Sequence, residues 1–143
     1  MFELSDQQVR HLEFIQGVIN RMASNSFTLK ALAGTITAAV LAYAGAAKVA
    51  QPILVLAGII PVGVFWYLDA RYLQLEESFR ALYDAVRKGQ VEESFDMDFR
   101  PHATKVRSRW KCWWSWSARN FYLTLVVVLI ILAIVLDRSN PAA

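Results

Sequence analysis

The stretch "YLTLVVVLIILAIVL" (122–136) decides the fold class, because fifteen consecutive residues carry no charge. A water-soluble helix needs a polar face, and this stretch has none. Two further blocks of the same kind lie upstream at 31–47 and 52–68, and the third block as a whole covers 121–136. Each is slightly shorter than the ~20 residues that cross a bilayer, but snorkelling basic residues at the block ends can supply the difference. The sequence therefore predicts an all-α integral membrane protein with three transmembrane helices.

The composition favours this interpretation over the alternative, a soluble bundle of buried helices. Of the 143 residues, 56% are hydrophobic and 19% are charged, and the mean hydropathy is +0.33. The N-terminus, "MFELSDQQVR", is polar and has no apolar region of the kind found in a cleavable signal peptide. The single cysteine, Cys112, leaves no partner for an internal disulfide.

The distribution of basic residues predicts the orientation. With three spans, 13 of the 15 Lys and Arg residues fall on the side of the N-terminus and the long middle segment, and 2 fall on the other side. By the positive-inside rule, residues 1–30 and 69–119 are expected in the cytoplasm. We therefore expect a multi-pass membrane protein with a cytoplasmic N-terminus and a periplasmic or external C-terminus.

The first segment, 1–27, is predicted to be a cytoplasmic amphipathic helix. Ser5 and Gln8 have the spacing of a capping box. An apolar stripe at helical spacing follows, which favours packing on another cytoplasmic helix over lying on the membrane surface. "SNS" (24–26) is expected to break or bend the chain. The stripe consists of Leu12, Ile15, Val18, Ile19 and Met22.

The second segment, 28–90, is predicted to be a transmembrane hairpin with a stalk helix. Small residues recur every fourth position in the first span, and such ridges let membrane helices approach closely, either on the second span or on another subunit. In the second span, Pro61 removes a backbone hydrogen bond and is expected to kink the helix, with Gly58 and Gly63 nearby as a candidate gate. The alternative is a static kink. The ridge comprises Gly34, Ala38, Ala42 and Ala46.

The second span continues without a stop into the stalk, so residues 53–88 are expected to form one helix that ends at Gly89. Apolar residues in the stalk are spaced as in a coiled coil. We expect this seam to be buried either between subunits or against the N-terminal helix of the same chain. The seam comprises Leu68, Tyr72, Leu75, Phe79, Leu82 and Val86.

The third segment, 91–119, is predicted to be a charged cytoplasmic linker, and the last, 120–137, the third transmembrane helix. Four tryptophans precede this helix, and indoles beside basic residues are typical of a membrane interface. Stacking on nucleic acid needs similar residues, but no nucleic-acid motif accompanies them, and no nucleic-acid partner is expected. A short strand or an extended stretch is a further expectation for 105–111. The tryptophans are Trp110, Trp113, Trp114 and Trp116. The bases expected to meet lipid headgroups or an anionic ligand are Lys105, Arg107, Arg109 and Lys111.

The remaining polar residues indicate no catalysis. The sequence shows no nucleophile–base pair, no metal-ligand spacing and no phosphate-binding glycine loop, so we expect neither an enzyme nor a cofactor. His11 and His102 are interpreted as solvated, and Asp69 as lying at the cytoplasmic edge, so that no span holds a buried charge. Cys112 is interpreted as an ordinary interfacial thiol, with palmitoylation as the alternative.

The layout resembles the SLATT-type membrane effectors of bacterial defence systems. The resemblance covers residues 8–90 and rests on the helix "QVRHLEFIQGVINRMASNS" (8–26), the tight hairpin, and the stalk "FWYLDARYLQLEESFRALYDAVRKG" (65–89) with its "RYLQLE" start (71–76). It implies a two-span unit that assembles into a pore, kills or arrests an infected cell, and responds to a nucleotide signal. The third span and the basic linker depart from the two-span pattern.

The function expected from these features is an oligomeric membrane effector that forms or gates a pore and disrupts the inner membrane. The bilayer and further copies of the chain are the expected partners, together with a nucleotide second messenger or a cytoplasmic sensor protein. The alternative is a non-conducting scaffold that recruits a cytoplasmic partner through its stalk and basic linker. A pore requires a ring of subunits, whereas a scaffold does not.

Overall fold

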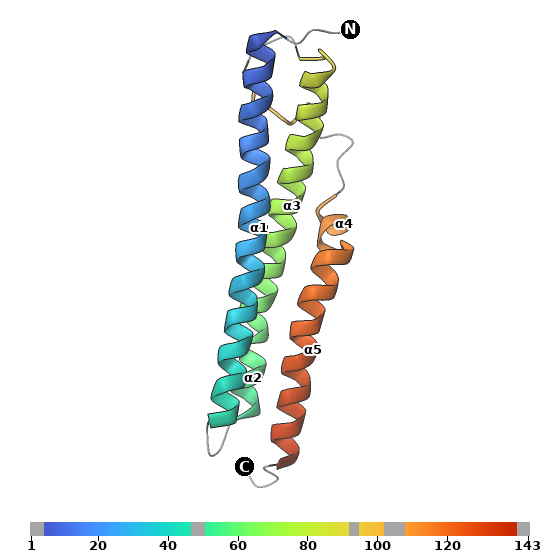
Figure 1. Cartoon of the computed structure of the whole chain (residues 1–143). Helices are drawn as coiled ribbons and strands as arrows, with labels where there is room; N and C mark the ends of the chain where they lie inside the picture. Colours follow the sequence, from blue (N-terminus) through green and yellow to red (C-terminus); the bar gives the residue numbers. More distant parts are fainter. Residues whose placement is uncertain (1–4, 47–50, 92–94, 102–107, 140–143) are drawn as a thin grey trace.

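A computed structural model of the chain describes residues 5–46, 51–91, 95–101 and 108–139. Every regular element within these ranges is a helix. Three long rods run side by side: α1 (Asp6–Ala46), then α2 (Pro52–Ala57) with α3 (Ile59–Arg87), and finally α5 (Trp116–Ser139) (Figure 1). The short α4 (Arg109–Trp113) precedes α5. The all-helical part of the predicted fold is therefore confirmed.

The three rods differ in length, and this divides the molecule into two halves. At 1.5 Å per residue, the 41 residues of α1 extend about 60 Å, whereas the 24 residues of α5 extend only about 36 Å. Consequently α5 flanks only one end of the α1–α3 pair (Figure 1). We call the part that α5 flanks the apolar half and the remainder the charged half.

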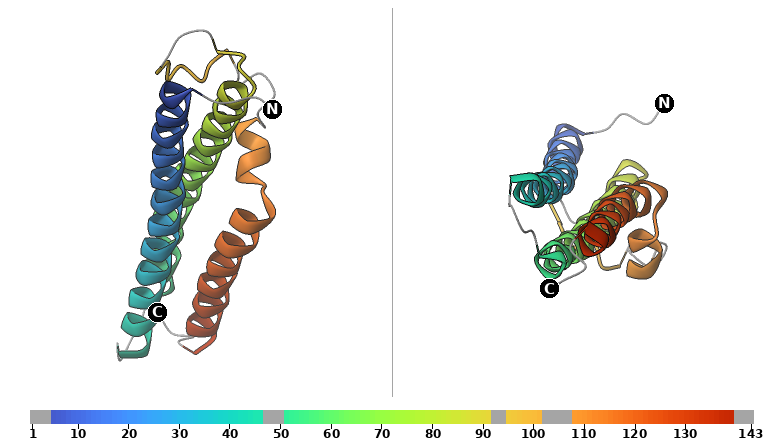
Figure 2. Two further views of the ribbon diagram at one scale, coloured as in Figure 1. Left: turned by 45° about the horizontal axis from the view of Figure 1, so that its top comes forward. Right: turned by 90° about the horizontal axis from the view of Figure 1, so that it is seen from below.

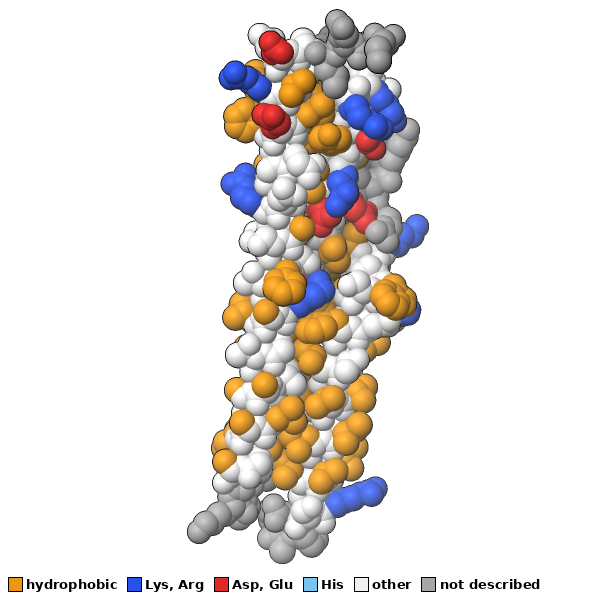
Figure 3. Space-filling view, in the orientation of Figure 1, with side chains coloured by type: hydrophobic (Ala, Val, Ile, Leu, Met, Phe, Trp, Pro, Cys, Tyr) orange, Lys and Arg blue, Asp and Glu red, His pale blue; other side chains and the backbone are white. Residues whose placement is uncertain are grey.

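The surface follows the same division. In the view of Figure 3, acidic and basic side chains gather on the charged half, and the apolar half is covered mainly by hydrophobic side chains. Large apolar residues are exposed there, among them Ile60 of α3 and Ile131 and Val135 of α5. Three helical stretches, Asp6–Ala46, Pro52–Arg87 and Trp116–Ser139, are long and apolar enough to cross a membrane. They correspond to the three predicted spans.

The helix α1 begins with the predicted capping box and then runs through the predicted break. The backbone N–H of Ser5 donates to Gln8 Oε1 at 3.0 Å, and the N–H of Gln8 donates to Ser5 Oγ at 3.3 Å. Residues 24–26 remain helical, so the expected break at "SNS" is wrong. The low helix propensity of Ser and Asn is outweighed by packing on α3, where Ser26 is buried.

The second rod is interrupted at Gly58, which separates α2 from α3. The single helix predicted for 53–88 is therefore wrong at this point. Pro61 has no N–H to offer the carbonyl of Ala57, four residues earlier. The N–H of Gly58 instead bonds the carbonyl of Val55 at 3.1 Å, one residue closer than in an α-helix. The predicted irregularity thus lies three residues before Pro61, while Gly63 sits in regular helix.

The C-terminus of α3 matches its prediction. Gly89 has a φ of +67°, which glycine adopts without a steric penalty. Around it, the N–H of Gln90 donates to the carbonyl of Ala85 at 3.0 Å, and the N–H of Gly89 donates to that of Val86 at 3.0 Å. These bonds satisfy carbonyl groups that would otherwise have no partner at the helix end.

Each half has its own core. In the charged half, the stripe on α1 packs against the end of α3: Leu12, Ile15 and Ile19 contact Leu82 and Val86. This contact confirms that the N-terminal helix packs on another helix of the chain. It also places the C-terminal part of the predicted seam inside one chain.

The rest of the seam is less buried. Phe79 packs on the edge of this core, Tyr72 and Leu75 are half-buried, and Leu68 is exposed. The seam is therefore not a continuous free stripe along α3.

The core of the apolar half lies where the three rods meet. It is built from Ala33 and Ala44 of α1, Val55 of α2, Val62 and Trp66 of α3, and Ala118, Tyr122, Leu129 and Ala133 of α5. Gly58 belongs to the same contact region: a Cβ there would lie 3.1 Å from the Val55 carbonyl oxygen and 3.2 Å from Val40 Cγ2. The absence of a side chain at Gly58 thus lets α1 and α5 approach the interruption.

We predict that Gly58→Val lowers the stability of the bundle by about 1–3 kcal/mol, because the added atoms have no space between Val40 and Leu129. Thermal unfolding of the purified protein in mild detergent measures the effect. Gly63→Val is the matched control, because a Cβ at Gly63 meets no atom within 4 Å. Equal losses for the two variants would contradict this role of Gly58.

Candidate functional site

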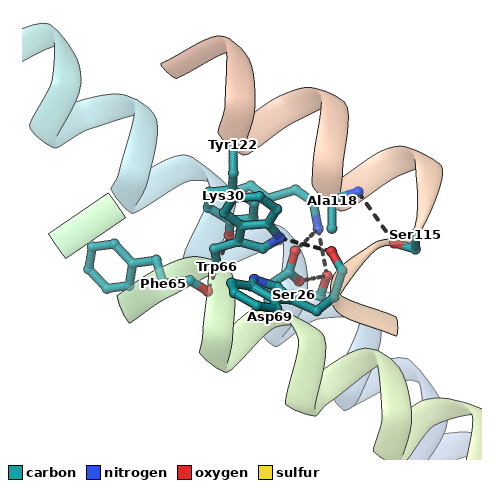
Figure 4. A network of polar contacts seen from close by, with 9 residues as sticks. Ser26, Lys30, Phe65, Trp66, Asp69, Ser115, Ala118 and Tyr122 are labelled. Atoms are coloured by element: carbon teal, nitrogen blue, oxygen red, sulfur yellow. Dashed lines mark hydrogen bonds and ion pairs between the residues drawn. The ribbon is translucent and has the colours of Figure 1, made fainter. Parts of the chain in front are cut away.

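A carboxylate is buried at the junction of the two halves. Asp69, on α3, is fully buried. Its Oδ2 accepts a hydrogen bond from Lys30 Nζ at 2.6 Å, and its Oδ1 accepts one from Ser26 Oγ. Lys30 Nζ also donates to Ser26 Oγ at 2.9 Å, which closes a triangle of three side chains (Figure 4). The carboxylate lies one residue beyond the predicted span 52–68, so the absence of a buried charge within a span stays a prediction.

The triangle is possible because of the spacing on α1. Ser26 and Lys30 are four residues apart and so lie on the same face of the helix, toward α3. A buried carboxylate is costly unless it is paired and hydrogen-bonded, and here both oxygens are occupied. The side chain of Lys30 is 19% exposed, whereas that of Asp69 is not exposed at all. The pair thus fixes α1 against α3 at one height.

Aromatic rings cover this triangle from the side of α4 and α5. The ring of Trp66 stacks on Tyr122 with centroids 5.8 Å apart and on Trp114 with centroids 6.1 Å apart. Trp113 approaches the same ring at 5.1 Å, tilted by 57°. Trp66 Nε1 donates to the backbone carbonyl of Trp113 at 3.0 Å, which holds the end of α4 against α3.

Tyr122 connects this aromatic cover to the ion pair. It is fully buried, and its hydroxyl donates to the backbone carbonyl of Phe65 at 3.4 Å. The same hydroxyl lies close to the Asp69 carboxylate (Figure 4). The rings exclude water around the ion pair, which strengthens its attraction. Every group in the triangle has a partner, so this arrangement is a structural latch between helices.

The four predicted interface tryptophans gather around α4 and the start of α5. Trp110, Trp114 and Trp116 are 70%, 56% and 76% exposed. Trp113 is half-buried, and its Nε1 is the one buried side-chain nitrogen or oxygen without a hydrogen-bond partner in the described part of the chain. The rings of Trp110 and Trp113 stack at 4.7 Å. Their position at a membrane interface stays a prediction.

The predicted basic group is only partly described. Lys105 and Arg107 lie outside the described residues. Arg109 opens α4, and Lys111 is exposed in the last turn of that helix. The strand expected over 105–111 is wrong for residues 109–111, which are helical because tryptophan contacts dock this turn onto α3.

Two further side chains are less exposed than expected. His11 is buried under the segment 95–101, which crosses the N-terminal turns of α1 (Figure 2), and its Nε2 lies 2.8 Å from the carbonyl oxygen of Asp96. The solvated interpretation of His11 is therefore wrong, and His102 lies outside the described residues. Cys112 is also buried, with its Sγ 4.0 Å from Glu77 Oε2. A thiol in that position is not accessible for palmitoylation.

The small-residue ridge of α1 lies off the contact with α3. Gly34 is half-buried, and Ala38, Ala42 and Ala46 are exposed. The positions of α1 that are buried in the apolar half are Ala33, Thr37 and Ala44. The ridge therefore does not carry the packing within one chain.

The decisive residues of the latch were missed from the sequence. The sequence pattern indicates a chain break at Ser26 and an edge position for Asp69. It indicates no role for Trp66 or Tyr122. The available signal was weak: Ser26 and Lys30 share one helical face, and Trp66 and Asp69 share another at i, i+3. Only the packing of α1 on α3 shows that these faces meet.

Within the described ranges, no group of three His, Cys, Asp or Glu side chains is placed to hold a metal ion. No protein-family model, curated protein or solved structure matches the chain. The functional interpretation therefore depends on the geometry of the chain itself. That geometry combines a buried latch, an aromatic cover and an exposed ridge of small residues.

We predict that Lys30→Met destabilises the fold by about 3–5 kcal/mol, because it leaves the buried Asp69 carboxylate without its cation. Asp69→Asn should cost less, since Lys30 retains partial contact with solvent. The double variant Lys30→Met/Asp69→Leu should recover most of the loss, because neither charge then remains. Unfolding in mild detergent measures all three.

The control for this series is Asp84→Asn, which breaks an exposed pair with Arg87 at 3.4 Å. Such pairs contribute up to about 1 kcal/mol. A loss for Lys30→Met no larger than that for Asp84→Asn would show that the latch does not hold the bundle.

Proposed function

We propose that the chain is an oligomeric membrane effector that forms or gates a pore across the bacterial inner membrane. Side chains of all three rods fill the centre of the apolar half, so the described part of one chain offers no route for ions. An aqueous path must therefore lie between copies of the chain. A ring of apolar helices can gate such a path by dewetting, without a charged lining.

The observation that carries this proposal is the exposed ridge of small residues on α1. Inside a bilayer, helices associate where small residues let their backbones approach, because lipid is as apolar as leucine. Ala38 and Ala42 are exposed and are not required for packing within the chain. We assign this ridge to contact with a second copy.

The interruption at Gly58 supports a gating role for the second rod. The six residues of α2 are separated from α3, and α2 packs on α5 through Val55 and Leu129 in the shared core. A short helix beyond a proline-induced interruption can reorient without unfolding the stalk. In the proposed pore, this end of the second rod opens and closes the path.

The resemblance to SLATT-type effectors extends the proposal to bacterial defence, with membrane disruption triggered by a cytoplasmic signal. The charged half supplies a route for such a signal, because α1 runs without interruption from the charged end to the apolar end. A nucleotide second messenger or a sensor protein acting on the charged half would move α1 together with α3, because the latch joins the two helices. These two kinds of trigger remain the proposed partners.

The alternative function is a non-conducting scaffold, and one feature of the charged half favours it. Phe14, Phe95 and Met97 form an exposed apolar patch beside Arg21, hollowed by a pocket of about 320 Å³. Phe95 has a φ of +67°, which is uncommon for a residue with a side chain. A patch of this kind can bind a cytoplasmic protein without any pore.

We predict that Ala38→Leu disrupts a discrete assembly of four or more subunits, because a bulky side chain holds the backbones of two ridges apart. The particle mass of the full chain in lipid nanodiscs measures the assembly. Ala39→Leu is the matched control, since Ala39 is also exposed on α1 but lies off the ridge. A wild-type monomer or dimer would favour the scaffold instead.

We predict that Pro61→Ala changes ion conductance in planar bilayers and reduces toxicity on expression. Alanine restores the N–H that the carbonyl of Ala57 lacks and so stiffens the second rod. Gly63→Ala, two residues from Pro61, is the control, because a Cβ at Gly63 meets no atom within 4 Å. Unchanged conductance and toxicity for Pro61→Ala would remove the gating role while leaving assembly untouched.

A further inference from the structure

A pocket of about 580 Å³ lies between α3 and α4, separate from the latch triangle. Aromatic rings form much of its wall, and Gln74 and Ser108 add polar groups. Among the described residues that line it, none is charged. The lining comprises Tyr67, Ala70, Gln74, Ser108, Trp110 and Trp113.

The polarity of this pocket changes along its length. Tyr67 and Gln74 lie on the same helix, seven residues apart, so the lining of α3 extends about 10 Å along the axis. Along α3, Tyr67 lies nearer the apolar half and Gln74 lies nearer the charged half. A molecule that fills this pocket therefore needs an apolar end and a polar end in that order.

The height of the pocket matches the headgroup region of a bilayer. With the apolar half in the membrane, Asp69 lies about 26 Å along the second rod from Pro52, close to the thickness of a hydrocarbon core. Tyr67 and Gln74 lie on either side of that level. A phospholipid at this depth presents its acyl chains toward the apolar half and its phosphate toward the charged half.

Charge at the rim favours an anionic lipid. Lys111 lines a neighbouring hollow of about 430 Å³ together with Trp110 and Trp114. The side chain of Lys111 is exposed in the last turn of α4.

We propose that this pocket binds one anionic phospholipid per chain. The glycerophosphate group lies between Gln74, Ser108 and Lys111. The part of the acyl chains nearest the headgroup packs against Tyr67 and Trp110. Binding of this kind differs from general contact with the lipid belt, because the stacked rings form a defined wall. The inference requires the apolar half to lie in a membrane, but it does not require the proposed pore.

The test is native mass spectrometry of the full chain in mild detergent, titrated with phosphatidylglycerol or with phosphatidylethanolamine of the same acyl chains. We expect one tightly retained phosphatidylglycerol per chain and on the order of tenfold weaker retention of phosphatidylethanolamine. Trp110→Ala removes one wall and should weaken phosphatidylglycerol retention on the order of tenfold.

Trp116→Ala is the matched control, because Trp116 is equally exposed near the same level but lines neither hollow. It should retain the lipid as the wild type does. Lys111→Gln changes only an exposed side chain and should abolish the preference for phosphatidylglycerol while leaving the fold intact. Thermal unfolding of each variant verifies folding.

Equal retention of the two lipids by the wild type, or equal losses for Trp110→Ala and Trp116→Ala, would overturn the pocket assignment. Both outcomes leave the assembly prediction untouched, since neither tryptophan lies on the ridge of α1. Conversely, a monomeric particle that still retains one phosphatidylglycerol would contradict the pore and support the lipid site.

Discussion

The buried carboxylate of Asp69 is the constraint on which the arrangement of the helices depends. A carboxylate removed from water must be neutralised by a nearby cation and hydrogen-bonded on both oxygens. Lys30 and Ser26 meet both needs from one face of α1. Because the three groups must coincide, α1 cannot slide or rotate on α3 without exposing an unpaired charge to an apolar core. The pair thereby defines the register of the two longest helices.

The latch also determines how the third rod docks. Its open side is covered by Trp66, Tyr122 and the end of α4, so that α4 and α5 pack on α3 at the same level. The tryptophan-rich segment therefore has two roles. Trp113 belongs partly to the interior, whereas Trp110 and Trp116 remain exposed. Helix packing, the exposed indoles and the pocket beside them thus meet at one height along the bundle.

Local features were predictable because they depend on neighbouring residues. The capping box of Ser5 and Gln8 and the stop at Gly89 follow from side-chain chemistry within one helical turn. Features that depend on a distant partner were not predictable. The local sequence predicts a helix break at Ser26, but Ser26 Oγ donates a hydrogen bond to Asp69, 43 residues away, and stays within the helix. The interruption near Pro61 fell at Gly58, where neighbouring helices approach closely enough to require a residue without a side chain.

The sequence by itself determined that the chain is helical, that three of its stretches are apolar enough to span a membrane, and that its charged residues lie outside these stretches. These properties follow from hydrophobicity and periodicity along the chain. Only the tertiary structure decided which faces meet. In the structure, Leu82 and Val86 pack against α1 of the same chain, whereas Ala38 and Ala42 remain exposed. Periodicity shows which helix face carries apolar or small residues, but it does not show which helix packs on that face. The packing partner depends on shape complementarity and on buried charges that come from distant parts of the chain.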